Sequence, residues 1–234
     1  MAKKIYFSRY DDTEALHKPG PATKFIPDWY KNAQSYLNDE KRPNSRQSYT
    51  TIKRCIPVFD SMTAGYMIVL DRDMYCEKTP DGPYFHWRTE GAIANPDDIL
   101  TQHDFFQVQG HPQNNLGHQL KLENSWLIKT EPGYSCLIIP PLHRDNVLII
   151  LPGIVDTDNY YEQINLPFNL KDKDFDGLIE AGTPIAQVIP FKREAYEMEI
   201  VPLDKKRILK NQRTIASRLF DAYRNSYWSR KEYK

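Results

Sequence analysis

The 234-residue sequence has few cysteines and few glycines, no long apolar run and no net charge. Its three cysteines show an odd count and no CxxC spacing, which excludes a disulfide scaffold and a zinc ribbon and suits a reducing compartment. No apolar stretch approaches the roughly 20 residues of a membrane span. The charged start MAKKIYFSRYDD also lacks the apolar core of a signal peptide. We therefore expect a cytoplasmic protein that does not bind membranes.

The composition is that of a globular chain rich in strands and turns. Hydrophobic residues make up 40% of the sequence and charged residues 26%, which excludes bulk disorder. Seventeen prolines stand beside ten glycines and fifteen tyrosines, a mixture more typical of short strands and turns than of a helical bundle. A chain of this length predicts one domain with appendages.

The charge is unevenly distributed along the chain. Residues 205–234 contain ten basic and two acidic residues, a local charge of +8, while the preceding 204 residues contain 21 basic and 29 acidic residues, a charge of −8. This basic segment is also aromatic. Such a segment can bind nucleic-acid phosphates, dock on an acidic surface of a partner subunit, or form a solvated helix on its own domain. The candidates for nucleic-acid or partner contact are Lys205, Lys206, Arg207 and Arg213.

The N-terminal part, residues 1–49, is predicted to be an arm with one short helix. A strand is expected at 4–7 and a helix over 27–37, where Pro27 suits a first helical position. The polar stretch NDEKRPNSRQS then forms an exposed linker.

Residues 50–203 are predicted to form a mainly β domain. Short β-rich runs alternate with turn sequences such as TPDG and EAGTP, which is typical of a sandwich or barrel. The expected strands are 51–57, 66–70, 105–108, 126–130, 135–139, 147–150, 162–167 and 185–191.

Residues 204–234 are predicted to form a basic C-terminal helix. Asp204 suits the N-cap position, and the helical period returns after it. Ile208, Ile215, Leu219 and Tyr223 would then form one stripe.

Four segments of the β-rich region form an ordered series: TAGYMIVL at 63–70, EPGYSCLIIPPLHR at 131–144, PGIVDTDNYYEQINL at 152–166 and EAGTPIAQVIPF at 180–191. Together they resemble the first four motifs of trimeric dUTPases and their dCTP-deaminase relatives. The resemblance implies a dUTPase-like β-clip barrel, preceded here by the N-terminal arm and helix and followed by the basic C-terminal helix. It also implies a homo-oligomer, a trimer, with sites at subunit boundaries.

The sequence departs from that family where the family holds its phosphates. Pro140 is followed by Pro141 and Leu142 where the second motif supplies Arg and Ser, and Pro184 stands where an Arg often precedes Ile-Ala-Gln. Proline lacks even a backbone N–H to offer a phosphate. Met67 stands at the acid of the first motif, and the glycine-rich fifth motif is absent.

Two residues keep positions that the family uses. Asp156 stands where the family places its water-activating carboxylate, and Gln187 occupies its usual place in the fourth motif. Each also has a structural interpretation, because an acid in a DTD turn often caps that turn and a strand Gln often satisfies backbone or subunit contacts. Tyr160 lies one step from the aromatic position that supports the deoxyribose, which is Asn159 here. Arg144 contacts a phosphate only if its loop is shifted relative to the second motif of the family.

The histidines and cysteines predict no metal site and no nucleophile. His111 and His118 flank a loop, and their spacing of seven fits neither a helix pair nor alternate strand positions. His143, Asp156 and Asp158 are residue types that bind metal ions, but no spacing pattern in the sequence indicates that they form one metal site. Cys136, in a predicted strand, is expected to be a small buried hydrophobe.

The four motif segments are present, but the residues that hold phosphate and metal in the family are replaced. This combination favours a non-catalytic dUTPase-like protein that acts as a structural or binding subunit. The tyrosine- and proline-rich composition is also similar to proteins of large tailed bacteriophages, so a virion component or phage regulatory protein, with a phage or host partner, is expected. One alternative is a dNTP pyrophosphohydrolase with Asp156 as base, Arg144 as anchor and Mg²⁺; otherwise no cofactor is expected. A further alternative is nucleic-acid binding through residues 205–234.

Overall fold

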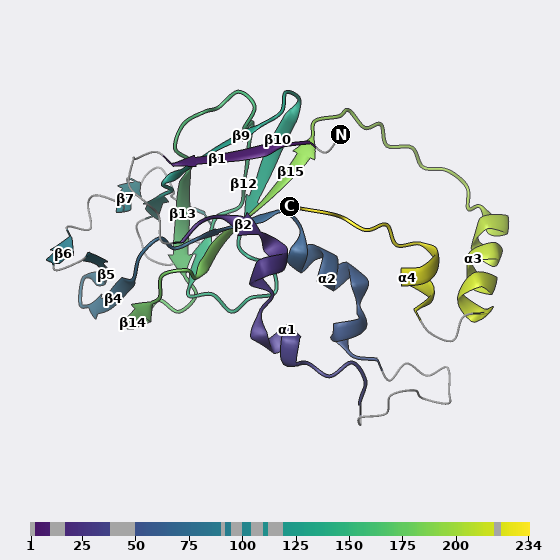
Figure 1. Ribbon diagram of the computed structural model, residues 1–234, viewed down its shortest axis with the longest axis horizontal. Helices are drawn as coiled ribbons and strands as arrows, with labels where there is room; N and C mark the ends of the chain where they lie inside the picture. The colour runs from purple at the N-terminus through teal and green to yellow at the C-terminus, as the bar shows by residue number, and fades with distance from the viewer. Residues whose placement is uncertain are drawn as a thin grey trace.

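The computed structural model describes residues 3–9, 17–37, 50–89, 92–94, 100–103, 110–111, 119–217 and 221–234. The mainly β fold expected from the sequence is confirmed, since most described elements are strands in antiparallel sheets. Figure 1 shows the strands gathered in one body, with α1 (Asp28–Asn32) and α2 (Ile56–Thr63) below it and α3 (Lys205–Ser217) and α4 (Ala222–Ser226) set apart at one side.

A five-stranded antiparallel sheet contains a strand from each of the four motif segments. Its order is β12 (Gly153–Val155), β10 (Tyr134–Ile139), β15 (Pro184–Lys192), β3 (Tyr66–Val69) and β2 (Gly20–Pro21). The long β15 pairs with β10 over six residues and with β3 on its other side. Segments that are far apart in sequence therefore lie side by side in this sheet.

Three smaller sheets complete the β body. One contains β11 (Leu148–Ile150), β13 (Asn165–Leu170), β8 (Gln119–Glu123) and β7 (Leu100–His103); another contains β14 (Gly177–Ile179), β4 (Met74–Thr79), β5 (Gly82–Thr89) and β6 (Ala92–Ala94). The third pairs β1 (Ile5–Arg9) with β9 (Trp126–Thr130). The N-terminal arm thus reaches the β body through β1 and β2. The division into residues 1–49, 50–203 and 204–234 stays a prediction.

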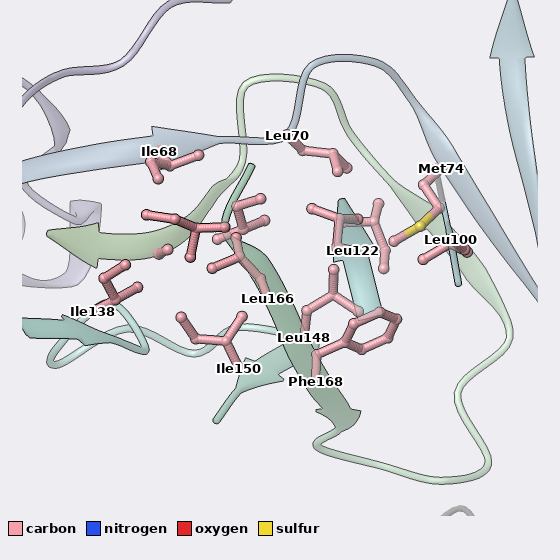
Figure 2. Packing of buried hydrophobic residues seen from close by; sticks show 14 of the residues in the cluster. Ile68, Leu70, Met74, Leu100, Leu122, Ile138, Leu148, Ile150, Leu166 and Phe168 are labelled. Carbon is pink, nitrogen blue, oxygen red and sulfur yellow. The ribbon is translucent and has the colours of Figure 1, made fainter. Parts of the chain in front are cut away.

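The hydrophobic core lies between these sheets. Figure 2 shows side chains from several strands meeting there, including Ile68, Leu70, Met74, Leu100, Leu122, Ile138, Leu148, Ile150, Leu166 and Phe168. The Phe168 ring is fully buried and meets Phe85 edge-on at 5.7 Å between centroids. Cys136 is buried here as expected, and burial raises the pKa of its thiol.

Two expectations in the N-terminal half, one strand and one helix, are wrong. The strand expected at 51–57 is instead a 3₁₀ turn, η3 (Ile52–Arg54), followed by α2 (Ile56–Thr63). Pro57 lies in the first turn of α2, where its missing N–H costs nothing, and the β-branched residues around it do not enter a sheet. The helix expected over 27–37 is only α1 (Asp28–Asn32), because Ala33 is already extended. A second 3₁₀ turn, η1 (Ala22–Phe25), precedes it.

The C-terminal helix is two helices rather than one. Asp204 is the N-cap as expected, since its Oδ1 accepts the Arg207 N–H at 2.9 Å, and α3 (Lys205–Ser217) follows. A separate helix, α4 (Ala222–Ser226), follows Asp221, whose φ is 56°. The expected single stripe is therefore wrong, because Tyr223 belongs to α4.

Some expectations fall outside the part of the chain that the structure describes. These are the strand at 105–108, His118 and Leu219. Among the described helices, none is long and apolar enough to cross a membrane.

Candidate functional site

The DTD segment forms a tight turn directly after β12. The Asp156 carbonyl accepts the N–H groups of Asn159 at 3.0 Å and Tyr160 at 2.8 Å. Thr157 points inward and is fully buried, with its hydroxyl 2.8 Å from that of Thr130 and 3.4 Å from the Cys136 sulfur. An inward Thr157 leaves the carboxylates on either side of it to face the end of β10.

Arg193 closes over both carboxylates of this turn. Its guanidinium donates to Asp158 Oδ1 at 2.7 Å and Oδ2 at 2.5 Å, a two-pronged contact of the kind that Arg and carboxylate geometry favours. The same guanidinium lies 3.2 Å from Asp156 Oδ1 and 3.1 Å from Ser135 Oγ. The turn is thus tied to the end of β15 by one cation.

Two further bonds fix the carboxylates. The Gly133 N–H donates to Asp158 Oδ2 at 2.7 Å, and the Ser135 hydroxyl donates to Asp156 Oδ1 at 2.6 Å. The Asp158 side chain is only 5% exposed, whereas that of Asp156 is 59% exposed. Asp156 is therefore the carboxylate of the turn that solvent or a ligand can reach.

The charge on Asp158 is strongly favoured. Hydrogen bonding from Arg193, helped by the Gly133 N–H and by Coulomb attraction, lowers the pKa of Asp158 to about 2. The hydrogen bond to Asp158 raises the pKa of Arg193 in turn. Since Asp158 is ionised throughout the physiological range, the pair holds the turn closed rather than moving protons.

Gln187 lies at the opposite end of the β10–β15 ladder and is fully buried. Its amide N–H₂ donates to the carbonyls of Ser61 at 2.9 Å and Ala64 at 2.7 Å, and its amide oxygen accepts the Leu142 N–H at 3.0 Å. In this arrangement the amide joins the end of α2 to the 140–146 loop and is not presented to a ligand.

Gly65 permits that junction. It has φ +70°, and a Cβ there would lie 2.0 Å from the Val188 carbonyl oxygen. Only glycine allows the chain to pass so close to β15 while turning from α2 into β3. The glycine of the TAG segment therefore has a packing role that requires no ligand.

Arg144 is placed in the loop at this same end. Its Nε and Nη2 atoms are buried and have no hydrogen-bond partner among the residues that the structure describes. Burial lowers the pKa of its guanidinium. A partly buried cation without a paired acid is suited to an anion, because an unpaired buried donor is costly.

Asp156 and Arg144 do not meet within one chain. The β10–β15 register runs from Tyr134 opposite Lys192 to Ile139 opposite Gln187, and at about 3.4 Å per residue this separates the two ends by about 17 Å. Asp156 accepts a hydrogen bond from Ser135 at the end of the ladder where Tyr134 lies opposite Lys192. The loop with Arg144 is held at the second end, where the His143 carbonyl accepts the Trp29 indole N–H at 2.7 Å.

Tyr160 lies beside the turn rather than over it. It is 48% exposed, and its hydroxyl donates to the Gln163 carbonyl at 3.3 Å. The neighbouring Tyr161 is 53% exposed, with the Lys129 ammonium 5.9 Å from its ring centroid. Two exposed tyrosine rings thus follow the DTD turn, and one of them lies beside Lys129 of β9.

The four basic candidates of the C-terminal segment all lie on α3. Lys205, Lys206, Arg207 and Arg213 are exposed, and α3 buries none of its side chains. It packs against α4, where the Tyr227 hydroxyl lies 3.3 Å from Asn211 Oδ1.

The positions that the family uses for metal and phosphate are filled by structural residues. Met67 is fully buried in β3, between β15 and β2. Pro184 begins β15, and its carbonyl accepts from Asn146 at 2.8 Å. Across the described ranges no group of three His, Cys, Asp or Glu side chains could hold a metal ion. His143 lies 3.1 Å from the Ser61 hydroxyl, at the ladder end away from Asp156.

Arg193 and Ser135 were not identified from the sequence. Arg193 follows β15 in the unremarkable sequence FKRE, and only the antiparallel register brings it beside Gly133, whose carbonyl accepts the Arg193 N–H at 2.9 Å. Pairing the second motif segment with the fourth in the correct register would have shown that Arg193 lies beside Gly133.

The chain matches no protein-family model and no curated protein. Among solved structures it is similar to a mutant dUTPase from phage phi11 of S. aureus, with 10% identity and a TM-score of 0.33; the match covers 86% of this chain and 99% of that one.

Two structures of the Staphylococcus bacteriophage 80alpha dUTPase are also similar, each with a TM-score of 0.26 over 56% of this chain. One is a mutant with dUpNHpp, at 12% identity over 89% of its chain, and the other has 14% identity over 97%. These proteins belong to the family that the four motif segments resemble. At TM-scores this low, function has to be inferred from the chain's own residues.

Proposed function

We propose that this chain is a dUTPase-like protein that does not catalyse and that serves as a structural or binding subunit of a homo-oligomer. The observation that supports this best is the closure of Arg193 on Asp158 and Asp156. The cation nearest the candidate base is engaged by the turn itself. It is therefore not free to neutralise a triphosphate.

The rest of the site supports the same proposal. A general base accelerates hydrolysis only when the reacting phosphorus is held near it, and that needs cations or backbone donors around the phosphates. Pro141, Leu142 and Pro184 stand where the family supplies such groups, and Met67 is buried at the position of the acid. Among the residues that the structure describes, the one cation bonded to Asp156 is Arg193, which is already held by Asp158.

The proposed setting is a bacteriophage protein, either a virion component or a regulatory protein in the host cytoplasm. A subunit that keeps the β scaffold and gives up the site is suited to assembly with copies of itself or with another phage or host protein. No cofactor is needed for this role.

Nucleotide turnover tests the proposal. Purified protein is incubated with each deoxynucleoside triphosphate and Mg²⁺, and pyrophosphate release is followed together with the melting temperature. Background release and an unchanged melting temperature with every nucleotide support a non-catalytic subunit. Turnover of any one nucleotide overturns it.

A second candidate function is pyrophosphohydrolysis with Asp156 as base, Arg144 as phosphate anchor and Mg²⁺ as cofactor. It is favoured by the buried, unpaired donors of Arg144. Because the ladder holds Asp156 and Arg144 at opposite ends of one chain, such a site requires two chains, with Asp156 from one and Arg144 from its neighbour. This geometry gives the alternative a sharp test.

Mixing inactive variants distinguishes a shared site from no site. If the enzymatic alternative holds, Asp156→Asn and Arg144→Met are each inactive, and mixed oligomers regain part of the activity because some sites contain neither change. Mixtures of either variant with itself are the matched controls. Failure of the mixture to regain activity rejects a site shared between chains.

A third candidate is nucleic-acid binding through α3 and the following segment. The exposed cations Lys206 and Arg213 lie two turns apart on the helix, which suits contacts with successive phosphates. The double variant Lys206→Glu/Arg213→Glu should then lose binding and its salt dependence, while Lys24→Glu, at an exposed site elsewhere, should not. Equal binding by all three proteins rejects this function.

A further inference from the structure

The sheet formed by β14, β4 and β5 has two different faces. Its inner face enters the core through Met74, Cys76 and Phe85, which are buried. Because side chains alternate along a strand, the residues between these point away from the core. Figure 1 shows this sheet at the end of the β body that lies away from α3 and α4. Its outward residues belong to none of the four motif segments.

Three aromatic rings gather on the outward face. The register places Tyr75 opposite His86, and Tyr84 lies two residues before His86 on the same strand. The His86 ring forms a T-shaped pair with Tyr84 at 4.6 Å between centroids and lies 6.4 Å from the Tyr75 ring. Leu178 of β14 lies opposite Tyr75 and completes what is here called the aromatic face, which consists of Tyr75, Tyr84, His86 and Leu178.

The aromatic face is open to solvent. Tyr75 and Tyr84 are 42% and 47% exposed, and Leu178 is 50% exposed. These fractions correspond to a surface on the order of 300 Å², about the size of the largest apolar patch on many monomers, which is often functional. A patch of this size on one sheet face suits a binding surface.

Hydrogen bonds hold the rings of the aromatic face in place. Glu77 Oε2 lies 2.9 Å from His86 Nε2, and the Tyr75 hydroxyl donates to Asp176 Oδ1 at 2.8 Å. The hydrogen bond to Asp176 raises the pKa of the Tyr75 phenol, which is therefore protonated at neutral pH. Rings that are already fixed reduce the entropy that a ligand loses by binding against them.

A cavity of about 260 Å³ adjoins the aromatic face, and Leu178 belongs to both. Asn146, Glu180 and Thr183 are polar residues in its lining, and Ile185 is one of the apolar ones. Apolar walls with a few polar groups are typical of small-molecule sites, whose volumes begin at roughly 300 Å³. The cavity is thus of a size for one small ring rather than for a nucleotide.

Charged groups beside the aromatic face and the cavity already have partners. The Lys78 N–H donates to Asp176 Oδ2 at 3.1 Å, and the Lys78 ammonium lies 2.9 Å from Asp174. The Lys171 ammonium pairs with Asp145, which lines the cavity. A phosphate would have to break these ion pairs, whereas a hydroxyl can add to a carboxylate, which has about four lone-pair sites. The surroundings therefore favour neutral hydroxyl donors over phosphate groups.

A saccharide has the two kinds of group that this surface can bind. The C–H groups on one side of a sugar ring are apolar and slightly positive, which suits the negative face of an aromatic ring. Its hydroxyls are neutral donors for carboxylate and amide oxygens. The strand faces of OB-folds bind oligosaccharides in other proteins, so an open sheet face is sufficient for this purpose.

We propose that the aromatic face and the adjoining cavity form a binding site for a neutral oligosaccharide. Tyr75 and Tyr84 stack on sugar rings, and Asp176 and Glu180 accept hydrogen bonds from sugar hydroxyls. The site is separate from the Asp156 turn in its residues, and it does not depend on the function proposed above.

A microarray of neutral oligosaccharides, probed with labelled full-length protein, tests this proposal. Wild type should bind at least one glycan, and Tyr75→Ala/Tyr84→Ala should lower the affinity for it about tenfold or more, since both stacking rings are lost. Tyr6→Ala/Tyr196→Ala, at exposed tyrosines elsewhere, is the matched control and should bind as wild type does. Circular dichroism checks that each variant is folded. A wild type that binds no glycan, or a Tyr75→Ala/Tyr84→Ala variant that binds as well as wild type, overturns the proposal.

A second measurement distinguishes a sugar from a nucleic acid on the same rings. Fluorescence polarisation follows binding of the best oligosaccharide and of single-stranded oligo(dT), each labelled, at low and at high salt. Sugar binding should change less than about twofold with salt, because no phosphate is involved. Oligo(dT) should bind equally to wild type and to Tyr75→Ala/Tyr84→Ala. Oligo(dT) binding that requires these two rings overturns the saccharide in favour of single-stranded nucleic acid.

Discussion

Arg193 and Asp158, 35 positions apart in the sequence, form a two-pronged ion pair with N–O distances of 2.7 and 2.5 Å. The pair joins the DTD turn to the end of β15. It therefore occupies the guanidinium that lies 3.2 Å from Asp156.

Loss of Arg193 should make stability depend less on pH. The Arg193 contact lowers the native pKa of Asp158 to about 2, below the roughly 3.9 of an unfolded Asp, so the pair stabilises the fold above about pH 4 and loses that effect as the pH falls toward 2. Arg193→Gln should lower the melting temperature by a few degrees at pH 7, and the two proteins should converge near pH 2.

Melting curves recorded across pH 2–7 check this prediction. Lys192→Gln is the neighbouring control, because Lys192 pairs with Glu194 at the surface, and its melting temperature should follow that of wild type. A constant difference between wild type and Arg193→Gln at every pH would contradict the assignment of the effect to Asp158.

Gln187 should matter for stability even without a ligand. Gln187→Leu keeps the apolar volume but leaves the carbonyls of Ser61 and Ala64 and the N–H of Leu142 without their partner, which should cost about 3 kcal/mol of unfolding free energy. Urea unfolding measures it, with Gln212→Leu on exposed α3 as a control expected to change little. A loss within the error of that control would show that the amide is not a structural bridge.

Two glycines with similar backbone angles should differ in their tolerance of alanine. Gly65 and Gly133 have φ of +70° and +84°, but a Cβ at Gly65 meets the Val188 carbonyl at 2.0 Å whereas one at Gly133 meets nothing within 4 Å. Gly133→Ala should cost about 1–2 kcal/mol, the strain of left-handed backbone. Gly65→Ala should cost about 4 kcal/mol or more or prevent folding, because backbone must move. Similar unfolding free energies for the two variants would contradict the close approach.

The three thiols should react at very different rates. Cys55 is exposed, while Cys76 and Cys136 are buried; burial raises the pKa of Cys76 to about 11 and that of Cys136 above its usual value. A thiol reagent at pH 8 should therefore label one site quickly in the native protein and all three after denaturation. Fast labelling that persists in Cys55→Ser would show that a buried thiol is accessible.

The sequence predicted the strands best where alternating apolar residues and turn residues agree. The expected strand at 126–130 coincides with β9, and that at 66–70 nearly coincides with β3. The TPDG turn was recognised, but the flanking β4 and β5 were not, because their buried residues are mixed with charged and aromatic ones. The stretch 51–57 has β-forming residues, yet packing of Met62 and Thr63 favours a helix there.

Single residues of the candidate site were predictable from the sequence, but the contacts between them were not. The turn at Asp156 follows from its local sequence, whereas the bonds of Gln187 to Ser61, Ala64 and Leu142 join segments that are far apart in the chain. Arg193, which decides what the turn can do, depends on the register between β10 and β15, and no local pattern fixes that register.

The most direct test of a non-catalytic role is a comparison of wild type with Asp156→Asn at high protein concentration. Pyrophosphate release from dUTP and dCTP with Mg²⁺ is measured for both proteins, prepared in parallel and matched by circular dichroism. We predict the same background rate for the two, since the cation that the structure places beside the exposed carboxylate, Arg193, is held by Asp158. A rate that is present in wild type and lost in Asp156→Asn would contradict the account and show that Asp156 takes part in turnover.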